Sequence, residues 1–224
     1  MNPRLSALTA EFVGTFFLLI GVVGSGIMAQ QLTDDVAIQL LANSTATVFV
    51  LVALILVFAN TSGAHFNQAV TLTDLALGGR SVRDAAEYIV VQTVGGVLGV
   101  IAANVMFELD AVSFSTTDRS SGGLWFAEVI ATVGLLLVIF GIVRKGDTSM
   151  VAYAVGSYIG AAYWFTSSTS FANPAVTVAR MFSDTFAGIE PASAPLFIVF
   201  QLIGVGVAIA LIRLIWPATV GDRP

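Results

Sequence analysis

Six long apolar stretches constrain the fold of this chain more than any other feature of its sequence. They run roughly over Leu5–Gln30, Val36–Asn60, Arg83–Phe107, Leu124–Val143, Ser149–Phe165 and Ala194–Leu214. Each approaches the roughly 20 apolar residues that a helix needs to cross a bilayer. The chain is 57% hydrophobic and only 10% charged, whereas a soluble domain carries about 25% charged residues. The sequence therefore predicts an all-α membrane protein with six transmembrane helices.

Two further segments, Gly63–Gly78 and Ser167–Gly188, are too short and too polar to span a membrane. They contain closely similar strings, AHFNQAVT at positions 64–71 and SFANPAVTVAR at positions 170–180. Irregular backbone at membrane depth is tolerated only where it is buried in protein or lines a wet cavity. We therefore expect both segments to be re-entrant, each with an extended arm followed by a half-helix. The arms are Thr61–Phe66 and Thr166–Ala172.

Asn67 and Asn173 mark the predicted starts of these half-helices. Asn is a favoured N-cap residue, and Pro174 stands at the first helical position, where its missing N–H costs nothing. Gln68 takes the place of proline in the first copy. Two half-helices that meet N-terminus to N-terminus focus positive potential between them, which repels protons and other cations while the Asn amides donate to neutral polar molecules. The pattern predicts conduction of small neutral solutes.

The two halves of the chain repeat each other. TAEFVGTFFLLIGVV in the first apolar stretch matches FAEVIATVGLLLVIFGI in the fourth, and Glu11 aligns with Glu128. Three spans separate the copies, and an odd number of crossings gives the copies opposite orientations. Inverted repeats of this kind place a substrate path near the midplane, at the pseudo-two-fold axis. We expect one transmembrane channel domain over residues 1–224, with repeats at about 1–110 and 120–224.

The two aligned glutamates require a role, because an intramembrane carboxylate is costly and usually faces the interior of the bundle. We interpret Glu11 and Glu128 as acceptors for backbone N–H groups of the re-entrant segments, which would hold these segments in place. The alternative for Glu11 is a position near the cytoplasmic end of its helix without such a role.

The single histidine, His65, has two interpretations. Its ring lines the path, or the ring packs against helices while only its carbonyl faces the path. It has no His, Cys or acidic neighbour at metal-ligand spacing, so we expect no metal and no cofactor. The chain has no cysteine and shows no acidic pair at catalytic spacing. The sequence thus argues against an enzyme.

The basic residues predict the orientation of the chain in the membrane. With both termini in the cytoplasm, the cytoplasmic set is Arg4, Arg80, Arg83, Arg144, Lys145, Arg213 and Arg223. Only Arg119 and Arg180 remain outside, where the loops are acidic. We expect a multi-pass protein of the cell (inner) membrane, in contact with membrane lipid. The formal net charge of −5 argues against nucleic acid as a partner.

In these features the chain resembles the major intrinsic protein family, the aquaporins and aquaglyceroporins. The resemblance covers essentially the whole chain and rests on GAHFNQAVT, FANPAVT, two Ala-Glu helix starts and the six-span inverted repeat. It implies a homotetramer with one pore per subunit and passive conduction of water or small neutral solutes. The two boxes of the pore constriction are then Asn67, Gln68 and Ala69, and Asn173, Pro174 and Ala175.

The position after the second box departs from the family pattern. It holds Val176, where family members usually carry an arginine that narrows the outer filter. The resemblance places the other filter positions at Thr47, at Ala161 or Gly160, and at Ser170. Such a filter is wide and uncharged, which favours glycerol-sized solutes.

Arg180 stands four residues after Val176, one helical turn of about 5.4 Å nearer the outside. We interpret it as a residue of the outer vestibule. The alternatives are a guanidinium that drops towards the filter and a solvated arginine paired with Asp184. Trp164 and Phe165 could also swing inward and narrow the path. A narrowed filter would make the channel mainly water-selective.

The valine after the box and the string AAYWFTSSTSFANPAV are similar to a bacterial branch of aquaglyceroporins linked to arsenic resistance. This resemblance implies export of trivalent arsenic as neutral arsenous acid, a triol of roughly glycerol shape. A secondary active transporter is the competing hypothesis. It would need ionisable groups for coupling, and only Glu11 and Glu128 are available. A structural or adhesive protein would not need the two asparagines.

Overall fold

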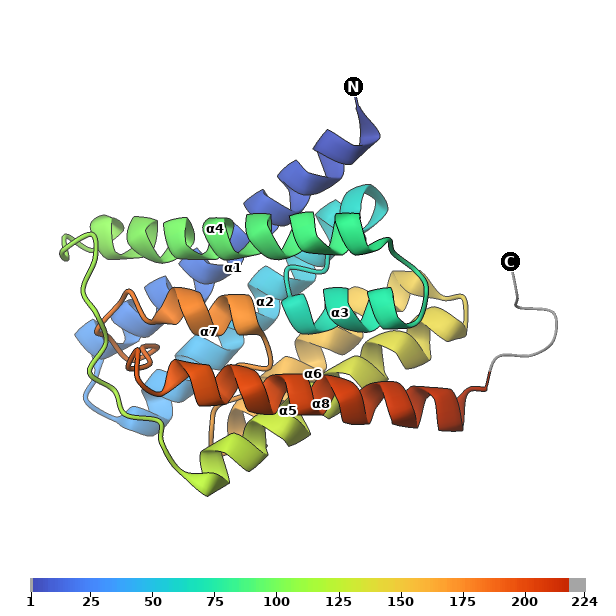
Figure 1. Cartoon of the computed structure of the whole chain (residues 1–224). Helices are drawn as coiled ribbons and strands as arrows, with labels where there is room; N and C mark the ends of the chain where they lie inside the picture. Colours follow the sequence, from blue (N-terminus) through green and yellow to red (C-terminus); the bar gives the residue numbers. More distant parts are fainter. Residues whose placement is uncertain (1, 218–224) are drawn as a thin grey trace.

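The computed structural model describes residues 2–217, and within this range the regular structure is entirely helical (Figure 1). Five helices are long and apolar enough to cross a membrane. They are α1 (Pro3–Leu32), α2 (Val36–Ser62), α4 (Val82–Met106), α5 (Gly122–Arg144) and α8 (Ala194–Ile215). Their ends lie within a few residues of the predicted spans. The predicted cytoplasmic residue Arg223 lies outside the described residues.

The remaining predicted span is shorter than expected. Helix α6 (Val151–Phe165) has 15 residues and follows a single 3-10 turn, η1 (Thr148–Met150). At 1.5 Å per residue, α6 is about 22 Å long, which is less than the thickness of a hydrocarbon core. The cause lies in the connection from α5, where Gly146 has a φ of 78° and Asp147 follows it, so that regular helix begins late.

The two re-entrant segments each contain a half-helix, as predicted. They are α3 (Gln68–Ala76) and α7 (Pro174–Arg180). Asn67 caps α3, since its Oδ1 accepts from the N–H of Ala69 at 2.8 Å. Asn173 caps α7 in the same way, through the N–H of Ala175 at 3.0 Å. The caps satisfy N–H groups that would otherwise be left without partners at the start of a helix.

The arm before each half-helix has the same unusual backbone. The third and the first residue before each capping asparagine adopt positive φ, namely Ala64 (49°), Phe66 (47°), Ser170 (54°) and Ala172 (46°). Such conformations cost about 1–3 kcal/mol each in residues other than glycine and persist only where the surroundings impose them. The shared pattern shows that the repeat extends to the conformation of the arms.

The packing of the helices follows the inverted repeat. Helix α1 packs against α2 and α4, and α5 packs against α6 and α8 in the corresponding way. Each half-helix also contacts the last long helix of the other repeat, α3 with α8 and α7 with α4. Glycines allow the closest approach between α1 and α4, because a Cβ on Gly95 or Gly99 would meet the carbonyl oxygen of Phe12 or Phe16. Small residues at helix interfaces have this role in membrane proteins generally.

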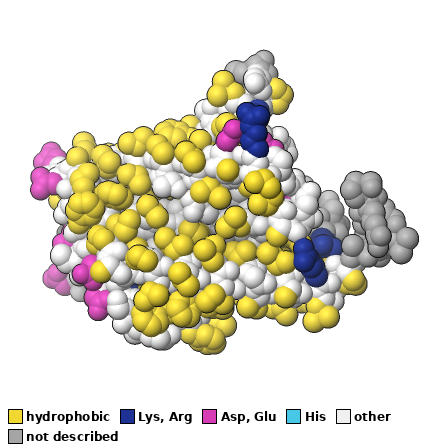
Figure 2. Space-filling model, in the orientation of Figure 1, with side chains coloured by type: hydrophobic (Ala, Val, Ile, Leu, Met, Phe, Trp, Pro, Cys, Tyr) yellow, Lys and Arg dark blue, Asp and Glu magenta, His cyan; other side chains and the backbone are white. Residues whose placement is uncertain are grey.

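Apolar and charged side chains occupy different parts of the molecular surface. Figure 2 shows hydrophobic side chains over most of the visible face, with acidic side chains alone at one end and basic side chains, some beside acidic ones, towards the other. Large apolar side chains are exposed along the helices, including Phe49 at 69% and Phe126 at 63%. An apolar surface of this extent is stable in lipid and not in water. The chain is therefore a membrane protein, and α1 begins and α8 ends towards the same side (Figure 1).

Candidate functional site

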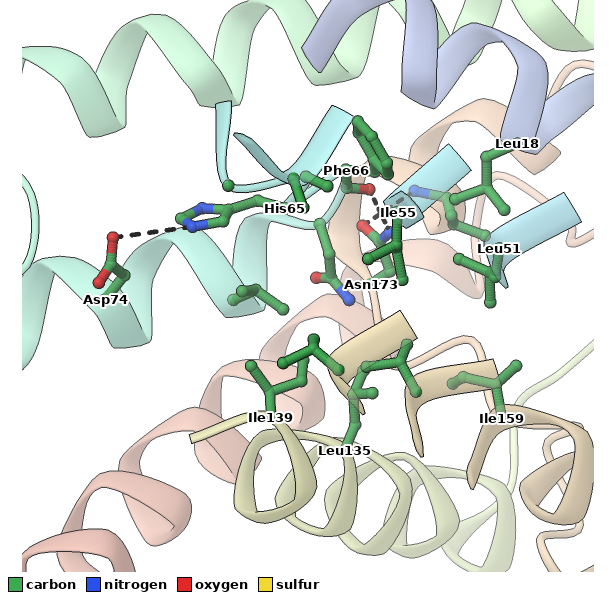
Figure 3. Close-up of a pocket in the computed structure, with 18 of the residues that line it drawn as sticks. Leu18, Leu51, Ile55, His65, Phe66, Asp74, Leu135, Ile139, Ile159 and Asn173 are labelled. Atoms are coloured by element: carbon green, nitrogen blue, oxygen red, sulfur yellow. Dashed lines mark hydrogen bonds and ion pairs between the residues drawn. The ribbon is translucent and has the colours of Figure 1, made fainter. Parts of the chain in front are cut away.

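An elongated cavity of about 370 Å³ runs between the long helices and is lined by both arms (Figure 3). Helix α2 lines it from Thr47 to Asn60. Helix α6 runs beside it and contributes every fourth residue, Val151, Val155, Ile159 and Tyr163. One end, the Arg80 mouth, also contains Asp74; the other, the Arg180 mouth, contains Thr47 and Tyr163. The cavity thus extends along most of the length of α2.

The two capping asparagines line the middle of the cavity and cross-link the repeats. The Nδ2 of Asn67 donates to the carbonyl of Ala172 in the opposite arm, at 2.8 Å. The Nδ2 of Asn173 donates to the carbonyl of Phe66, also at 2.8 Å. Each Nδ2 carries two protons, so one N–H per amide remains for a molecule in the cavity. The Asn67 side chain is therefore held by two hydrogen bonds and the Asn173 side chain by three, and each still presents a donor.

The other residues of the two boxes build the half-helices rather than the cavity wall. Ala69, Pro174 and Ala175 are buried in the first turns of α3 and α7, and none of them lines the cavity. Gln68 points away towards α4, where its Nε2 donates to the hydroxyl of Thr93 at 2.7 Å. The replacement of proline by Gln68 thus adds an interhelical bond and leaves the lining unchanged.

Glu11 is fully buried and accepts four hydrogen bonds at the first arm. Its Oε1 accepts from the Ser62 hydroxyl at 2.7 Å and from the N–H of His65 at 2.9 Å. Its Oε2 accepts from the N–H of Phe66 at 2.7 Å and from Nε2 of Gln92 at 2.8 Å. Glu11 therefore contacts the backbone of the first arm directly, next to the positive-φ residues.

Glu128, also fully buried, has the corresponding position in the second repeat. It accepts from the N–H groups of Phe171 at 3.0 Å and Ala172 at 2.9 Å, and from Nε2 of Gln201 at 2.6 Å. Gln201 also donates to the hydroxyl of Thr177 in α7 at 2.9 Å, as Gln92 does to the hydroxyl of Thr71 in α3. Each carboxylate is thus linked to its arm and, through a glutamine, to its half-helix.

Sequence reasoning missed both glutamines, although the sequence contained a signal. Gln92 begins the string QTVG in the third predicted span, and Gln201 begins QLIG in the sixth. These spans occupy equivalent places in the two repeats. A polar residue at the same position of two apolar helices indicates a shared buried partner.

The Arg180 mouth contains four residues that were named from the sequence. Thr47, Ser170, Val176 and Arg180 all line the cavity, together with Tyr163. The Tyr163 hydroxyl lies 3.1 Å from Oγ1 of Thr47, which in turn donates to the carbonyl of Asn43. The Ser170 hydroxyl is buried and has no partner among the described residues. Ser170 therefore offers a free hydroxyl to the cavity.

The predicted filter position on α6 was wrong. Ala161 is exposed on the outer face of the helix and does not line the cavity, and Gly160 faces Val48 of α2. The cavity side of α6 carries Ile159 and Tyr163 instead. The cavity wall therefore carries a tyrosine where a small residue was expected.

Arg180 is buried, with 3% of its surface exposed. Its Nε donates to the carbonyl of Ala187, and its Cζ lies 3.5 Å from the centre of the Phe171 ring. The solvated pair with Asp184 is absent from the described contacts, because the carboxylate of Asp184 accepts from Thr116 instead. Arg180 thus faces the cavity.

The two aromatic residues that were expected to be able to narrow the path lie on the outer surface. Trp164 is 51% exposed and Phe165 is 56% exposed, and neither lines the cavity. Nε1 of Trp164 donates to the hydroxyl of Ser44 on α2. The aromatic residues that line the cavity at this mouth are Tyr163 and Phe171 instead.

A second arginine lies behind the same mouth. Arg119, in the connection between α4 and α5, has its Cζ 5.0 Å from the centre of the Phe171 ring and donates from Nε to the carbonyl of Gly188 at 2.9 Å. Burial lowers the pKa of the Arg119 guanidinium, although Glu128 and Tyr163 oppose this change. Within residues 2–217 neither Arg119 nor Arg180 forms an ion pair.

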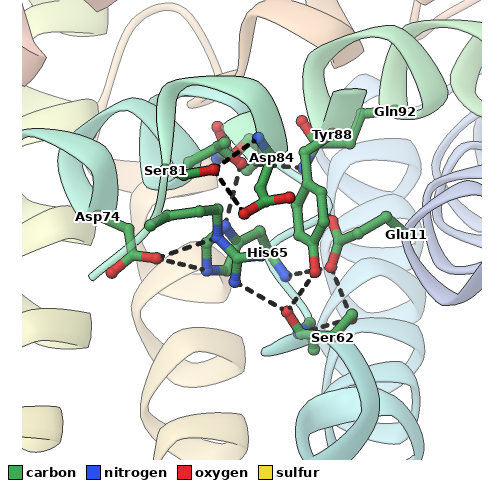
Figure 4. A network of polar contacts seen from close by, with 12 residues as sticks. Glu11, Ser62, His65, Asp74, Ser81, Asp84, Tyr88 and Gln92 are labelled. Carbon is green, nitrogen blue, oxygen red and sulfur yellow. Dashed lines mark hydrogen bonds and ion pairs between the residues drawn. The ribbon is translucent and has the colours of Figure 1, made fainter. Parts of the chain in front are cut away.

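The Arg80 mouth contains a polar network (Figure 4). The His65 ring lines the cavity, with Nδ1 3.0 Å from the Thr71 hydroxyl and Nε2 3.7 Å from Oδ2 of Asp74. Nε of Arg80 lies 3.2 Å from the same Asp74 oxygen, and its guanidinium carbon lies 4.0 Å above the Tyr88 ring. Unlike Arg180, Arg80 is therefore paired with a carboxylate.

Neither mouth has the ligand geometry of a metal centre. Among residues 2–217 no three side chains of His, Cys, Asp or Glu are placed to hold a metal ion. Between the two mouths the described lining carries no charged side chain and is mostly apolar. Figure 3 shows Leu51, Ile55, Leu135 and Ile159 around Asn173. A path of this kind favours small molecules that form hydrogen bonds and carry no charge.

Comparisons with known proteins agree with this architecture. The family model described as major intrinsic protein matches residues 2–170. The chain is 46% identical over 211 residues to aquaglyceroporin AqpS of Rhizobium meliloti (strain 1021), covering 93% of this chain and 90% of the relative. It is 30% identical over 217 residues to aquaporin TIP2-2 of Zea mays, covering 91% and 84%.

A solved structure shares the fold. The X-ray structure of the aquaglyceroporin from Plasmodium falciparum matches with a TM-score of 0.71 and 22% sequence identity, and the match covers 96% of this chain and 98% of that chain. This similarity supports the inverted arrangement of long helices and two half-helices.

Proposed function

The chain belongs to the major intrinsic protein family, and from that premise we propose that it conducts glycerol-like polyols and neutral metalloid hydroxides such as arsenous acid, together with water. Members of this family are passive membrane channels for water and small solutes and not enzymes. The proposal concerns which solutes pass and how charged species are rejected.

The observation that carries the proposal is the composition of the cavity wall. Asn67 and Asn173 each keep one N–H for a passing molecule, and the lining around them is apolar. A polyol has hydroxyl groups along one edge and C–H groups along the other, so it can use such a wall without leaving a polar group unpaired. An ion would lose its hydration shell without a compensating charge.

The residues of the Arg180 mouth favour the passage of solutes larger than water. Val176 replaces the usual arginine beside the second box, and the free hydroxyl of Ser170 offers both a donor and an acceptor. The relative from Rhizobium meliloti is an aquaglyceroporin, which supports the same solute class. Arsenous acid has three hydroxyl groups and a size similar to glycerol, and the chain contains no cysteine that would capture trivalent arsenic.

We assign cation and proton rejection at the centre to the paired N-termini of α3 and α7. Both half-helices point their N-terminal ends at the asparagines, and partial positive charge accumulates at such ends. In the same proposal Glu11 and Glu128 act as braces for the arms. Saturated by hydrogen bonds, they are poor candidates for ion coupling, which disfavours a secondary active transporter.

The assembly and orientation belong to the proposal as well. We place both termini in the cytoplasm, the Arg80 mouth inside and the Arg180 mouth outside, in the inner membrane of the cell. The channel forms a homotetramer with one pore per subunit. Each subunit is one domain with inverted repeats at about 1–110 and 120–224.

A mainly water-selective channel is the second candidate, and a specific observation favours it. Tyr163 and Arg180 line the same mouth, and an aromatic ring with a guanidinium leaves less room than Val176 and Ser170 alone suggest. The two candidates differ in solute flux and not in water flux.

Light scattering on reconstituted vesicles separates the candidates. Water permeability is measured after a hyperosmotic shock with an impermeant sugar, and solute permeability after iso-osmotic exchange with glycerol, urea or arsenite. Vesicles with Val176→Trp, whose indole projects into the Arg180 mouth, and protein-free vesicles are the controls. Re-swelling with glycerol and arsenite supports the proposal. Water flux without solute flux supports the second candidate, and the absence of both overturns the proposal.

A further inference from the structure

We propose that Arg180 is a charge filter of this channel, displaced by one helical turn from the usual position, and that Phe171 holds it there. The inference rests on the proposed conduction of neutral solutes and deepens it, because it adds a second barrier to charge at the Arg180 mouth. The solutes it excludes are cations, and those it admits are uncharged molecules with hydroxyl groups.

The first argument is position. Val176 and Arg180 lie on the same face of α7, and both line the cavity. Four residues along an α-helix advance about 6 Å, slightly more than one turn. The guanidinium that is missing beside the second box is therefore supplied one turn further along the same wall. It shares the mouth with Tyr163, Thr47 and the free hydroxyl of Ser170.

The second argument is that Arg180 is held in place. Its Nε bonds to the carbonyl of Ala187, and the guanidinium stacks on the Phe171 ring at 3.5 Å. The backbone of Phe171 is in turn bonded to Glu128. A buried, stacked guanidinium has little freedom to move out of the path. Phe171 is thus a positioning residue whose own place is fixed by the brace of the second arm.

The third argument is charge. Asp184, the acidic residue one turn away in sequence, bonds to Thr116, and within the described chain no carboxylate lies within ion-pair distance of Arg180. Arg119 adds a second guanidinium within 5.0 Å of the same ring centre. An unpaired positive charge beside a narrow path of low dielectric acts strongly on ions in that path.

The two ends of the cavity differ in this respect. At the Arg80 mouth the guanidinium is paired with Asp74, so its field is largely cancelled. At the Arg180 mouth no carboxylate of the described residues lies within ion-pair distance of the guanidinium. A full charge at the mouth and the partial charges at the half-helix N-termini then form two barriers in series. Loss of one barrier leaves a selective but leakier channel.

The test measures ion leak and solute flux in the same vesicles. We expect Arg180→Gln to raise the potassium and proton leak by on the order of tenfold while glycerol re-swelling persists. Chloride leak should rise less, because removal of a positive charge favours cations. Arg180→Lys keeps the charge and should stay near the wild type, and Phe171→Leu should give an intermediate leak.

A position swap and a matched control make the test specific. The double variant Val176→Arg with Arg180→Val returns the guanidinium to the box and should restore cation rejection. Arg83→Gln removes an arginine whose side chain is 76% exposed outside the cavity, and it should change nothing.

Two results would overturn the inference. One is an unchanged cation leak in Arg180→Gln, and the other is an equal rise in potassium and chloride leak, which indicates loosened packing and not lost charge. If Arg180→Gln yields no folded protein, the potassium and chloride leaks of the swap variant and of Phe171→Leu test the inference by the same criteria. Absence of glycerol flux in the wild type would reject the proposed solutes but leave the comparison of ion leaks readable.

Discussion

Replacement of Glu128 by glutamine should destabilise the fold by several kcal/mol, because the glutamine amide has one acceptor oxygen where the carboxylate has two. The carboxylate accepts from two backbone N–H groups of the second arm and from Gln201. In Glu128→Gln the remaining oxygen can serve Ala172 and Gln201, and the new NH₂ group then faces the N–H of Phe171. A buried donor left without an acceptor costs about 1–3 kcal/mol.

The two retained bonds also weaken when their acceptor loses its charge. Hydrogen bonds to charged groups contribute about 1.5–3 kcal/mol, against about 0.5–1.5 kcal/mol for neutral pairs, so each loses roughly 1 kcal/mol. The sum is a loss of about 3–5 kcal/mol of unfolding free energy. Glu11→Gln should lose more, because Glu11 accepts four hydrogen bonds where Glu128 accepts three.

The assay is reversible unfolding in mixed micelles titrated with SDS and followed by the loss of helical circular dichroism. Glu190→Gln is the matched control, since the side chain of Glu190 forms no hydrogen bond among the described contacts and is partly exposed, just after the second re-entrant segment. The reasoning fails if Glu128→Gln unfolds within experimental error of Glu190→Gln. Glycerol flux measured in parallel should fall with Glu128→Gln, as the arm loses its support.

Three further outcomes are expected. Val176→Arg adds a second guanidinium to the Arg180 mouth and should depress glycerol and arsenite flux much more than water flux. Equal losses of solute and water flux would show that Val176 is not part of the filter. Gly99→Ala forces α1 and α4 apart, since its Cβ meets the carbonyl of Phe16, and should cost about 1–3 kcal/mol of unfolding free energy. Gly206→Ala, with open space around its Cβ, is the control and should not destabilise the fold, because alanine favours a helix more than glycine does. Mercurials should leave water permeability unchanged in stopped-flow measurements, because the chain has no cysteine; a block reversed by added thiol would contradict this.

Much of the fold follows from local signals in the sequence. Long apolar stretches bounded by polar residues gave the spans to within a few residues, and Asn67 and Asn173 marked the starts of both half-helices. These features depend on short-range chemistry, namely hydropathy over one helix and capping within one turn. The pairing of Glu11 with Glu128 also followed, because the repeat is visible in the letters.

The side of α6 that faces the cavity could not be deduced in this way. A helix in a membrane channel is apolar towards lipid and largely apolar towards the path, so its sequence carries no clear period. The sequence therefore did not show whether Ala161 or Tyr163 faces the path. The predicted filter position, Ala161, lies two residues before Tyr163 and is on the lipid side of the helix.

The burial of Arg180 depended on where a helix ends. A pair with Asp184 assumes one more helical turn, but α7 ends at Arg180. The chain then turns back, so that Ala187 supplies an acceptor and Asp184 reaches Thr116. The ring under the guanidinium, Phe171, comes from the arm before the half-helix. These are long-range contacts, and no local pattern encodes them.

The reciprocal bonds between the asparagines and the opposite arms have a consequence for biogenesis. Asn67 donates to Ala172 and Asn173 donates to Phe66, so the first repeat emerges from the ribosome with an amide and a carbonyl that only the second repeat can satisfy. Until the second repeat inserts, the first arm keeps its positive-φ residues without that support. These two contacts at the channel centre therefore form only after the second repeat has inserted.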